Sequence, residues 1–354
     1  METKKVLIYN HNYTFSKDAR LHTNPYSEEH TCDLSYFVDS TSYSKIAIFN
    51  LLPANIDEAK LILNRIKDCA DQVIIYSVEV NPITLELILD FDHLNFSFVI
   101  NGFLNVNLQN ASIYNQNFWL INSRFLYIAK YPYILRDKHD SFTNKPFYFE
   151  VMYGVPRIHR EFVHNIIKDD DKFYKTEFLT TSSVWSDCLQ LNTEIWEDEI
   201  SAIPNQKEFV MYMGEELNLA QIIPLKIYKK AAYSIICETW WDNRFSFFTE
   251  KIAKPILAQR LFIVISGRHY LKNLRKLGFR TFDGIIDESY DDEPNNDKRW
   301  NKAIESANAL CELDQETVLR QCAGIFIHNY RVLEAMPFHQ VEDVLTSEII
   351  KSLV

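Results

Sequence analysis

Short apolar runs separated by helical spacing organise the first third of the chain. Residues 6–9, 46–50, 73–80 and 96–100 are largely apolar over the length of a strand. Between the second and third runs, residues 55–72 repeat apolar side chains every three or four positions, which predicts a helix with one buried face. Because strands buried on both faces read as continuous apolar runs, this order predicts a parallel sheet covered by helices.

The alternation resumes in the second half, after a polar segment. The run 125–129 predicts one more strand of the first sheet, and the polar residues 130–146 predict a connection between domains. Two successive α/β domains are therefore expected, with a ligand cleft between them at the carboxyl ends of the strands. In the second domain we predict strands at 147–154, 231–239 and 261–266, helices at 159–168, 269–278, 297–313 and 314–336, and either type at 207–213.

Charge and cysteine usage narrow the class of protein. The net charge of −11 disfavours non-specific binding to nucleic acid. The six cysteines are scattered without a CxxC pair, so we expect reduced thiols in a cytoplasmic protein, not disulfides or a zinc site. The apolar run near the N-terminus is too short for a signal peptide, and no window approaches the ~18 apolar residues of a membrane span.

A first candidate site lies at YGVPRIHREF, residues 153–162, between a predicted strand and a predicted helix. Arg157, His159 and Arg160 cluster at the turn, where Gly154 permits a tight backbone. Helix N-termini favour anions, and arginine adds paired donors for phosphate oxygens. The pattern fits a phosphate-binding turn, and equally a solvated basic surface turn.

A second candidate site lies at IICETWWDNRFSFFTEKIAKPILA, residues 235–258. Glu238 ends an apolar strand, the place where α/β proteins bind ligands. Thr249 is a suitable cap for the next helix, with Glu250 and Lys251 in its first turn. Lysine is unfavourable beside a helix N-terminus, so an anion would explain Lys251, and Lys254 extends the same face. The alternative is an ordinary capped helix.

These motifs resemble those of a known enzyme family. The region from about 147 to 300 is similar to the donor-binding domain of the α-1,3-fucosyltransferase family, and more closely to glycosyltransferases of large tailed bacteriophages and marine bacteria. The first half of the chain shows no such resemblance. The matching segments are FFTEK at 247–251, KPI at 254–256, LGF at 277–279, TFD at 281–283 and IDESYD at 286–291, after Gly154, Arg157, His159 and Arg160.

The resemblance implies a GT-B-like α/β fold, in which two Rossmann-like domains face a cleft. Residues 1–140 would form the acceptor-side domain, 141–330 the nucleotide-sugar-binding domain, and 331–354 a C-terminal helical tail. The implied activity is metal-independent and needs no cofactor: a hexosyl or fucosyl-type sugar moves from a nucleotide-sugar donor to a hydroxyl group. Two Trp stand in the loop where fucosyltransferases have Phe-Glu-Asn, which leaves the sugar and the nucleotide open.

The resemblance also implies roles for individual residues. Glu250 would accept hydrogen bonds from ribose hydroxyls, while Lys251 and Arg157 would neutralise the diphosphate leaving group. The implied donor-binding set is Arg157, His159, Arg160, Glu238, Asn243, Thr249, Glu250, Lys251 and Lys254.

The N-terminal half must supply a general base if the reaction inverts the anomeric centre. Glu79, at the end of a predicted strand, is the best candidate, with Asp39 and Asp92 as others. Asp90 and Asp92 also form an Asp-x-Asp pattern, so a metal-dependent transferase is one alternative. A non-catalytic module of the same fold that binds nucleotides or glycans is another.

The acceptor stays open in the sequence. A glycan, a lipid-linked sugar, a protein or a modified base in phage-type DNA all offer a suitable hydroxyl group, and the protein would act in the cytoplasm, that of the host cell if it is viral. The acidic runs at 169–171 and 287–293 are interpreted as solvated loops.

Overall fold

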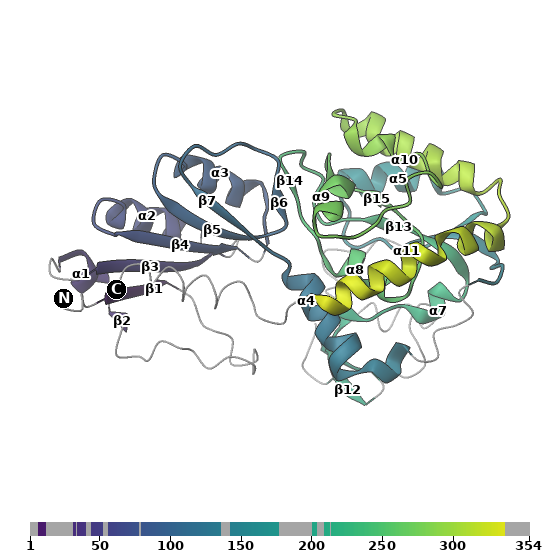
Figure 1. The fold of residues 1–354 in the computed structure, drawn as a ribbon, viewed down its shortest axis with the longest axis horizontal. Helices are drawn as coiled ribbons and strands as arrows, with labels where there is room; N and C mark the ends of the chain where they lie inside the picture. The colour runs from purple at the N-terminus through teal and green to yellow at the C-terminus, as the bar shows by residue number, and fades with distance from the viewer. Residues whose placement is uncertain are drawn as a thin grey trace. The chain divides into compact units, whose positions relative to one another are not determined.

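The computed structural model describes residues 6–11, 31–32, 34–39, 44–51, 56–77, 79–135, 142–176, 200–203, 209–212 and 214–336. These residues form two compact units: unit 1 holds the described residues up to Phe118, and unit 2 is Trp119–Met336 (Figure 1). Both units mix helices with a parallel sheet, which confirms the predicted α/β class. The predicted boundaries at 140 and 330 stay predictions, and residues 337–354 of the predicted tail lie outside the described residues.

Unit 1 is built on one parallel sheet in the order β2-β1-β3-β4-β5-β7. The four apolar runs predicted in this region all form its strands. The strands of this sheet are β1 (Val6–His11), β2 (Thr31–Cys32), β3 (Ser44–Leu51), β4 (Gln72–Ser77), β5 (Phe96–Asn101) and β7 (Ser112–Gln116). The short strand β6 (Phe103–Leu104) is not part of it.

Helices lie between these strands, and the apolar spacing at 55–72 predicted one of them. The helices are α1 (Leu34–Asp39), α2 (Ile56–Ile66) and α3 (Pro82–Asp90). Helix α2 buries Ile56, Ala59, Leu63 and Ile66, the face expected from the sequence. Helix α3 starts at a proline after Asn81, whose side chain accepts a hydrogen bond of 2.9 Å from the amide of Thr84.

The strand order in unit 1 reverses direction between β1 and β3. Such a reversal creates a topological switch point, where doubly wound sheets bind ligands beyond the carboxyl ends of the strands. The segments that follow these two strands, residues 12–30 and 52–55, lie outside the described residues.

The predicted strand at 125–129 is wrong, because this segment is helical. It belongs to η3 (Phe125–Lys130), a π-helical segment that continues α4 (Phe118–Arg124) and precedes η4 (Pro132–Leu135). The buried Tyr127 hydroxyl donates to the carbonyl of Gln221 at 2.7 Å and accepts from the amide of Ile223 at 3.0 Å. A short apolar run does not distinguish a buried strand from a buried helix.

Unit 2 contains a second parallel sheet in the order β15-β13-β8-β9. Its strands are β8 (Phe147–Val151), β9 (Phe173–Lys175), β13 (Ala231–Cys237) and β15 (Phe262–Ile265). The chain starts at β8, adds β9 on one side, and then adds β13 and β15 on the other side. The switch point of this sheet therefore lies between β8 and β13.

Two pairs of helices accompany this sheet: α5 packs with α10, and α8 packs with α11 (Figure 1). The helices are α5 (Ile158–Ile167), α7 (Leu225–Tyr228), α8 (Glu250–Leu257), α9 (Tyr270–Lys276), α10 (Asn296–Leu310) and α11 (Gln315–Ala335), with the short 3₁₀ turns η5 (Leu219–Gln221) and η6 (Ser289–Asp292). An antiparallel sheet is formed by β10 (Ile200–Ala202), β11 (Phe209–Tyr212) and β12 (Glu215–Asn218), so the described part of the segment 207–213 is a strand. Strand β14 (Phe245–Ser246) follows β13. Gly278, past the end of α9, has the left-handed backbone expected of a C-cap, with φ at 93°.

The interpretation of residues 287–293 as a solvated loop is wrong. Glu288 is buried and accepts hydrogen bonds from Thr281 Oγ1 at 2.6 Å, from the amide of Phe282 at 2.7 Å and from Arg275 at 2.6 Å. Asp291, also buried, accepts from the amides of Leu271 and Lys272 in the first turn of α9, both at 2.9 Å. These carboxylates therefore hold the loop against α9, and charge-assisted bonds of this kind stabilise a buried acid.

The buried position of Glu288 yields a stability prediction. Glu288→Ala removes the acceptor of the Phe282 amide, and an unsatisfied buried donor costs about 1–3 kcal/mol. We expect a loss of about 2 kcal/mol in the free energy of unfolding, measured by urea titration. Glu305→Ala, at an exposed position of α10, is the matched control. Equal stability of the two variants would show that the buried carboxylate contributes little.

Candidate functional site

The carboxyl ends of β8 and β13 define the candidate site, because they flank the switch point of the second sheet. The loop after β8 leads through Gly154 and Arg157 into α5, and the loop after β13 begins with Glu238. Both candidate sites predicted from the sequence, 153–162 and 235–258, contribute residues here. They are separated by about eighty residues in the chain and meet because their strands are paired.

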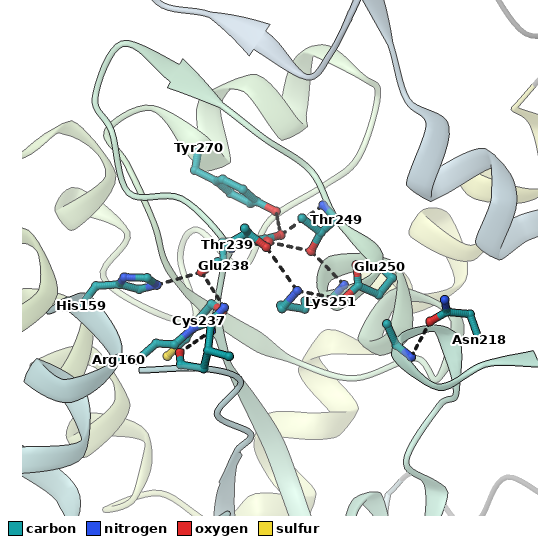
Figure 2. A network of polar contacts seen from close by, with 12 residues as sticks. His159, Arg160, Asn218, Cys237, Glu238, Thr239, Thr249, Glu250, Lys251 and Tyr270 are labelled. Carbon is teal, nitrogen blue, oxygen red and sulfur yellow. Dashed lines mark hydrogen bonds and ion pairs between the residues drawn. The ribbon is translucent and has the colours of Figure 1, made fainter. Parts of the chain in front are cut away.

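Glu238 joins these loops through its backbone. Its carbonyl oxygen accepts hydrogen bonds from His159 Nε2 at 2.8 Å and from Arg160 Nη2 at 3.2 Å, both on α5 (Figure 2). Since His159 must donate here, its Nε2 carries the proton. Burial and the neighbouring Arg160 lower the pKa of His159 to about 3, so the ring is neutral.

The Glu238 side chain holds the start of α8. Its carboxyl group is fully buried and accepts from Thr249 Oγ1 and from the Tyr270 hydroxyl, each at 2.6 Å (Figure 2). Burial raises the pKa of Glu238 above its usual value, although Lys251 and these hydrogen bonds oppose the increase. One residue therefore fixes both the α5 side and the α8 side of the site.

Thr249 is the cap of α8, as predicted. Its hydroxyl accepts from the amide of Lys251 at 3.2 Å, and its backbone is extended. Glu250 and Lys251 consequently occupy the first turn. The Lys251 ammonium group lies 2.8 Å from Glu250 Oε1 and 3.4 Å from Thr239 Oγ1.

Arg157, in the loop between β8 and α5, also contacts Thr239. Its Nη1 donates to the Thr239 carbonyl at 2.8 Å, and its guanidinium lies 4.5 Å from the centre of a Trp240 ring. Trp240 stacks in turn on Trp241, with ring centres 6.1 Å apart. Arg157 and Lys251 therefore converge on Thr239, one at its carbonyl and one at its hydroxyl.

His159 and Arg160 support the site through hydrogen bonds to backbone carbonyl groups of its loops. Both side chains are buried, and Arg160 also donates to the carbonyls of Val155 at 2.9 Å and Cys237 at 3.4 Å. A Cβ atom at Gly154 would lie 2.8 Å from Arg160 Nη1, so glycine makes room for this guanidinium. His159 Nε2 and the two terminal nitrogens of Arg160 thus donate to backbone carbonyl groups, while Arg157 and Lys251 are only partly buried.

Asn243 ties two loops together. Its side-chain oxygen accepts from the amide of Arg268 at 2.9 Å, and its amide group donates to the carbonyl of Pro294 at 2.9 Å. The loop after β15 also approaches closely here, since a Cβ atom at Gly267 would lie 2.2 Å from the carbonyl oxygen of Asp242. Of the predicted donor-binding residues, Asn243 thus has a bracing position at the edge of the site.

A second group of buried charged residues is formed by Glu150 of β8 and Lys254 of α8. Glu150 of β8 is in register with Ser234 of β13, and both are buried. Burial raises the pKa of Glu150 to about 7, although Arg260, Ser234 and Lys254 oppose the increase. Lys254 is 9% exposed, and burial lowers its pKa to about 8 despite the attraction of Glu250.

Glu250, buried in the first turn of α8, remains a carboxylate. Burial on its own would raise its pKa, but the positive charges of Lys251 and Lys254 hold the pKa below its usual value. A buried carboxylate beside two cations is able to accept hydrogen bonds from hydroxyl groups of a ligand.

The predicted residues of the N-terminal half lie in unit 1. Glu79 is half-buried, two residues past the end of β4, and its carbonyl accepts from Ser77 Oγ at 3.0 Å. Asp39 is the last, exposed residue of α1. Asp90 forms an ion pair with Lys60, and Asp92 accepts from the amide of Gln109 at 2.9 Å. Within the described ranges, no group of three or more His, Cys, Asp or Glu side chains is arranged to hold a metal ion.

Two residues of the site were not singled out in the sequence. Thr239 directly follows Glu238, and Tyr270 begins α9 after the GRH segment. Their roles depend on packing between segments far apart in the chain. The only signal in the sequence was the position of Thr239 after an apolar strand.

Comparison with known proteins adds no family assignment. No protein-family model matches the chain, and no curated protein shows detectable similarity to it. Among the helices that the structure describes, none combines the length and apolar character needed to cross a bilayer.

The raised pKa of Glu150 predicts how stability depends on pH. A carboxyl group whose pKa is raised on folding contributes stability while protonated, and this contribution is lost as the pH rises from 4.5 to about 7. Glu150→Gln should therefore match the wild type at pH 4.5 and be more stable at pH 8, by at most about 3 kcal/mol. Thermal unfolding at both pH values measures the difference. Glu161→Gln, exposed on α5, is the control. A variant that is less stable than the wild type at pH 8 would contradict the assignment.

Proposed function

We propose that unit 2 binds the diphosphate of a nucleotide sugar and that the protein is a metal-independent glycosyltransferase with a GT-B arrangement of two Rossmann-like domains. The observation that carries the proposal is the convergence of Arg157 and Lys251 on Thr239 at the switch point of the sheet. Partly buried cations beside a helix N-terminus favour phosphate oxygens.

The proposed chemistry is the transfer of a hexosyl or fucosyl-type sugar to an acceptor hydroxyl. As the bond to the sugar breaks, negative charge develops on the leaving diphosphate, and fixed cations stabilise it most when water is excluded. Arg157 offers paired donors, and Lys251 offers a compact charge. Glu250 accepts hydrogen bonds from ribose hydroxyls in this proposal.

The remaining residues divide into bracing and catalytic groups. Glu238, His159 and Arg160 hold the loops in place and do not contact the donor. Glu79 stays the proposed general base, in line with its position after β4. The acceptor is a glycan or another hydroxyl compound, with a modified DNA base as an alternative.

Calorimetry with a panel of nucleotide sugars tests this proposal. Diphosphate donors that carry guanine, uracil, thymine or adenine are compared with a CMP-sugar, which lacks the diphosphate. At least one diphosphate donor should bind, and Arg157→Met or Lys251→Met should weaken it by roughly 10- to 100-fold, the effect of losing a charged hydrogen bond. Lys272→Met, exposed on α9, should bind like the wild type.

Release of nucleoside diphosphate in the presence of acceptors separates catalysis from binding alone. Binding without turnover over a broad set of acceptors would favour the non-catalytic module. Failure of every nucleotide sugar to bind, or unchanged binding by the Arg157 and Lys251 variants, would overturn the proposal.

A further inference from the structure

In the proposed function, Glu250 and a bound diphosphate compete for the Lys251 ammonium group. Its ammonium group lies 2.8 Å from Glu250 Oε1, and the Glu250 side chain is only 9% exposed. A bound diphosphate would draw Lys251 away from this carboxylate. Glu250 is the buried member of this partly buried pair, and a buried charge that loses its partner is left uncompensated, which is destabilising. Something must therefore replace Lys251 beside Glu250.

Lys254 lies where it can replace Lys251 beside Glu250. It follows Glu250 by four residues on α8, the spacing and order in which a glutamate and a lysine interact best on a helix. Lys254 is 9% exposed, and burial and neighbouring charges, not a hydrogen bond from a described residue, shift its pKa. The charge of Glu250 acts on Lys254 more strongly than any other charge does. A largely buried lysine is less costly when a carboxylate pairs with it directly.

The charges around Lys254 keep it available. Glu250 and Lys251 act on it from α8, and Glu150 acts on it from the strand β8. One oxygen of Glu150, Oε2, is buried and has no hydrogen-bond partner within the described residues. Arg260 in turn acts on Glu150. The charges of Glu150 and Lys254 thus act on each other. No direct ion pair between these two described residues fixes Lys254 in place.

We infer that Lys254 is a positioning residue that takes over Glu250 when Lys251 turns to a bound diphosphate. The carboxylate then keeps a positive partner in both states, so that it stays ionised and oriented while Lys251 serves the phosphates. This inference rests on the proposed function, because it requires a diphosphate at Arg157 and Lys251.

A double-mutant cycle tests the exchange. The probes are GDP, UDP, ADP and dTDP, and binding to the full chain is measured by calorimetry for the wild type, Lys254→Met, Glu250→Gln and the double variant. Lys254→Met should weaken the nucleoside diphosphate that binds best by about tenfold. In the Glu250→Gln background the same change should have less than about a twofold effect, because the carboxylate that needs a partner is gone. Lys254→Arg should restore wild-type affinity.

The outcomes separate the inference from the proposed function. An equal loss in both backgrounds would mean that Lys254 contacts the phosphates directly, and this would overturn the exchange. Failure of Lys254→Arg to restore binding, with an unchanged melting temperature, would overturn it as well. If Arg157→Met weakens binding but Lys254→Met does not, the inference alone fails. If no nucleoside diphosphate binds the wild type, both proposals fail together.

Discussion

The arrangement of unit 2 depends on Glu238 at the end of β13. Its carbonyl oxygen receives donors from α5, and its buried carboxyl group receives hydroxyls from Thr249 and Tyr270. A buried carboxyl group is stable only when its oxygens are satisfied, so the three segments must stay together. The next residue, Thr239, is thereby held in one position, and Arg157 and Lys251 are positioned by their contacts with it.

Local charge at this site differs from the charge of the whole chain. The protein carries a net charge of −11, yet the partly buried Arg157 and Lys251 meet at Thr239 beside the switch point. The acids Glu150 and Glu250 are buried nearby. Glu250 and Glu150 keep the lysines of α8 near negative charge, which reduces the cost of burying them. A concentrated basic site can thus exist on an acidic protein, and the field that a ligand meets is set by nearby groups.

Local patterns were sufficient for many of the elements but not for the contacts between them. The buried face of α2, the Thr249 cap and the Gly278 turn follow from spacing and backbone preference. Tyr127 lies in a helix that was predicted as a strand, because its apolar run fits both types. Glu288 is buried among donors that no local pattern reveals.

The candidate site was predictable in its residues but not in its geometry. Arg157, Glu250 and Lys251 were identified from motifs and resemblance. The convergence of Arg157 and Lys251 on Thr239, in contrast, required the pairing of β8 with β13. The bracing roles of His159 and Arg160 depend on burial, which the basic turn did not indicate, since a basic cluster suggests exposure.

A crystal structure of the full chain with a bound nucleoside diphosphate tests the central claim most directly. We expect the phosphates within hydrogen-bond distance of the Arg157 guanidinium and the Lys251 ammonium group, beside Thr239. A nucleotide bound elsewhere, with neither cation in contact with a phosphate, would contradict it.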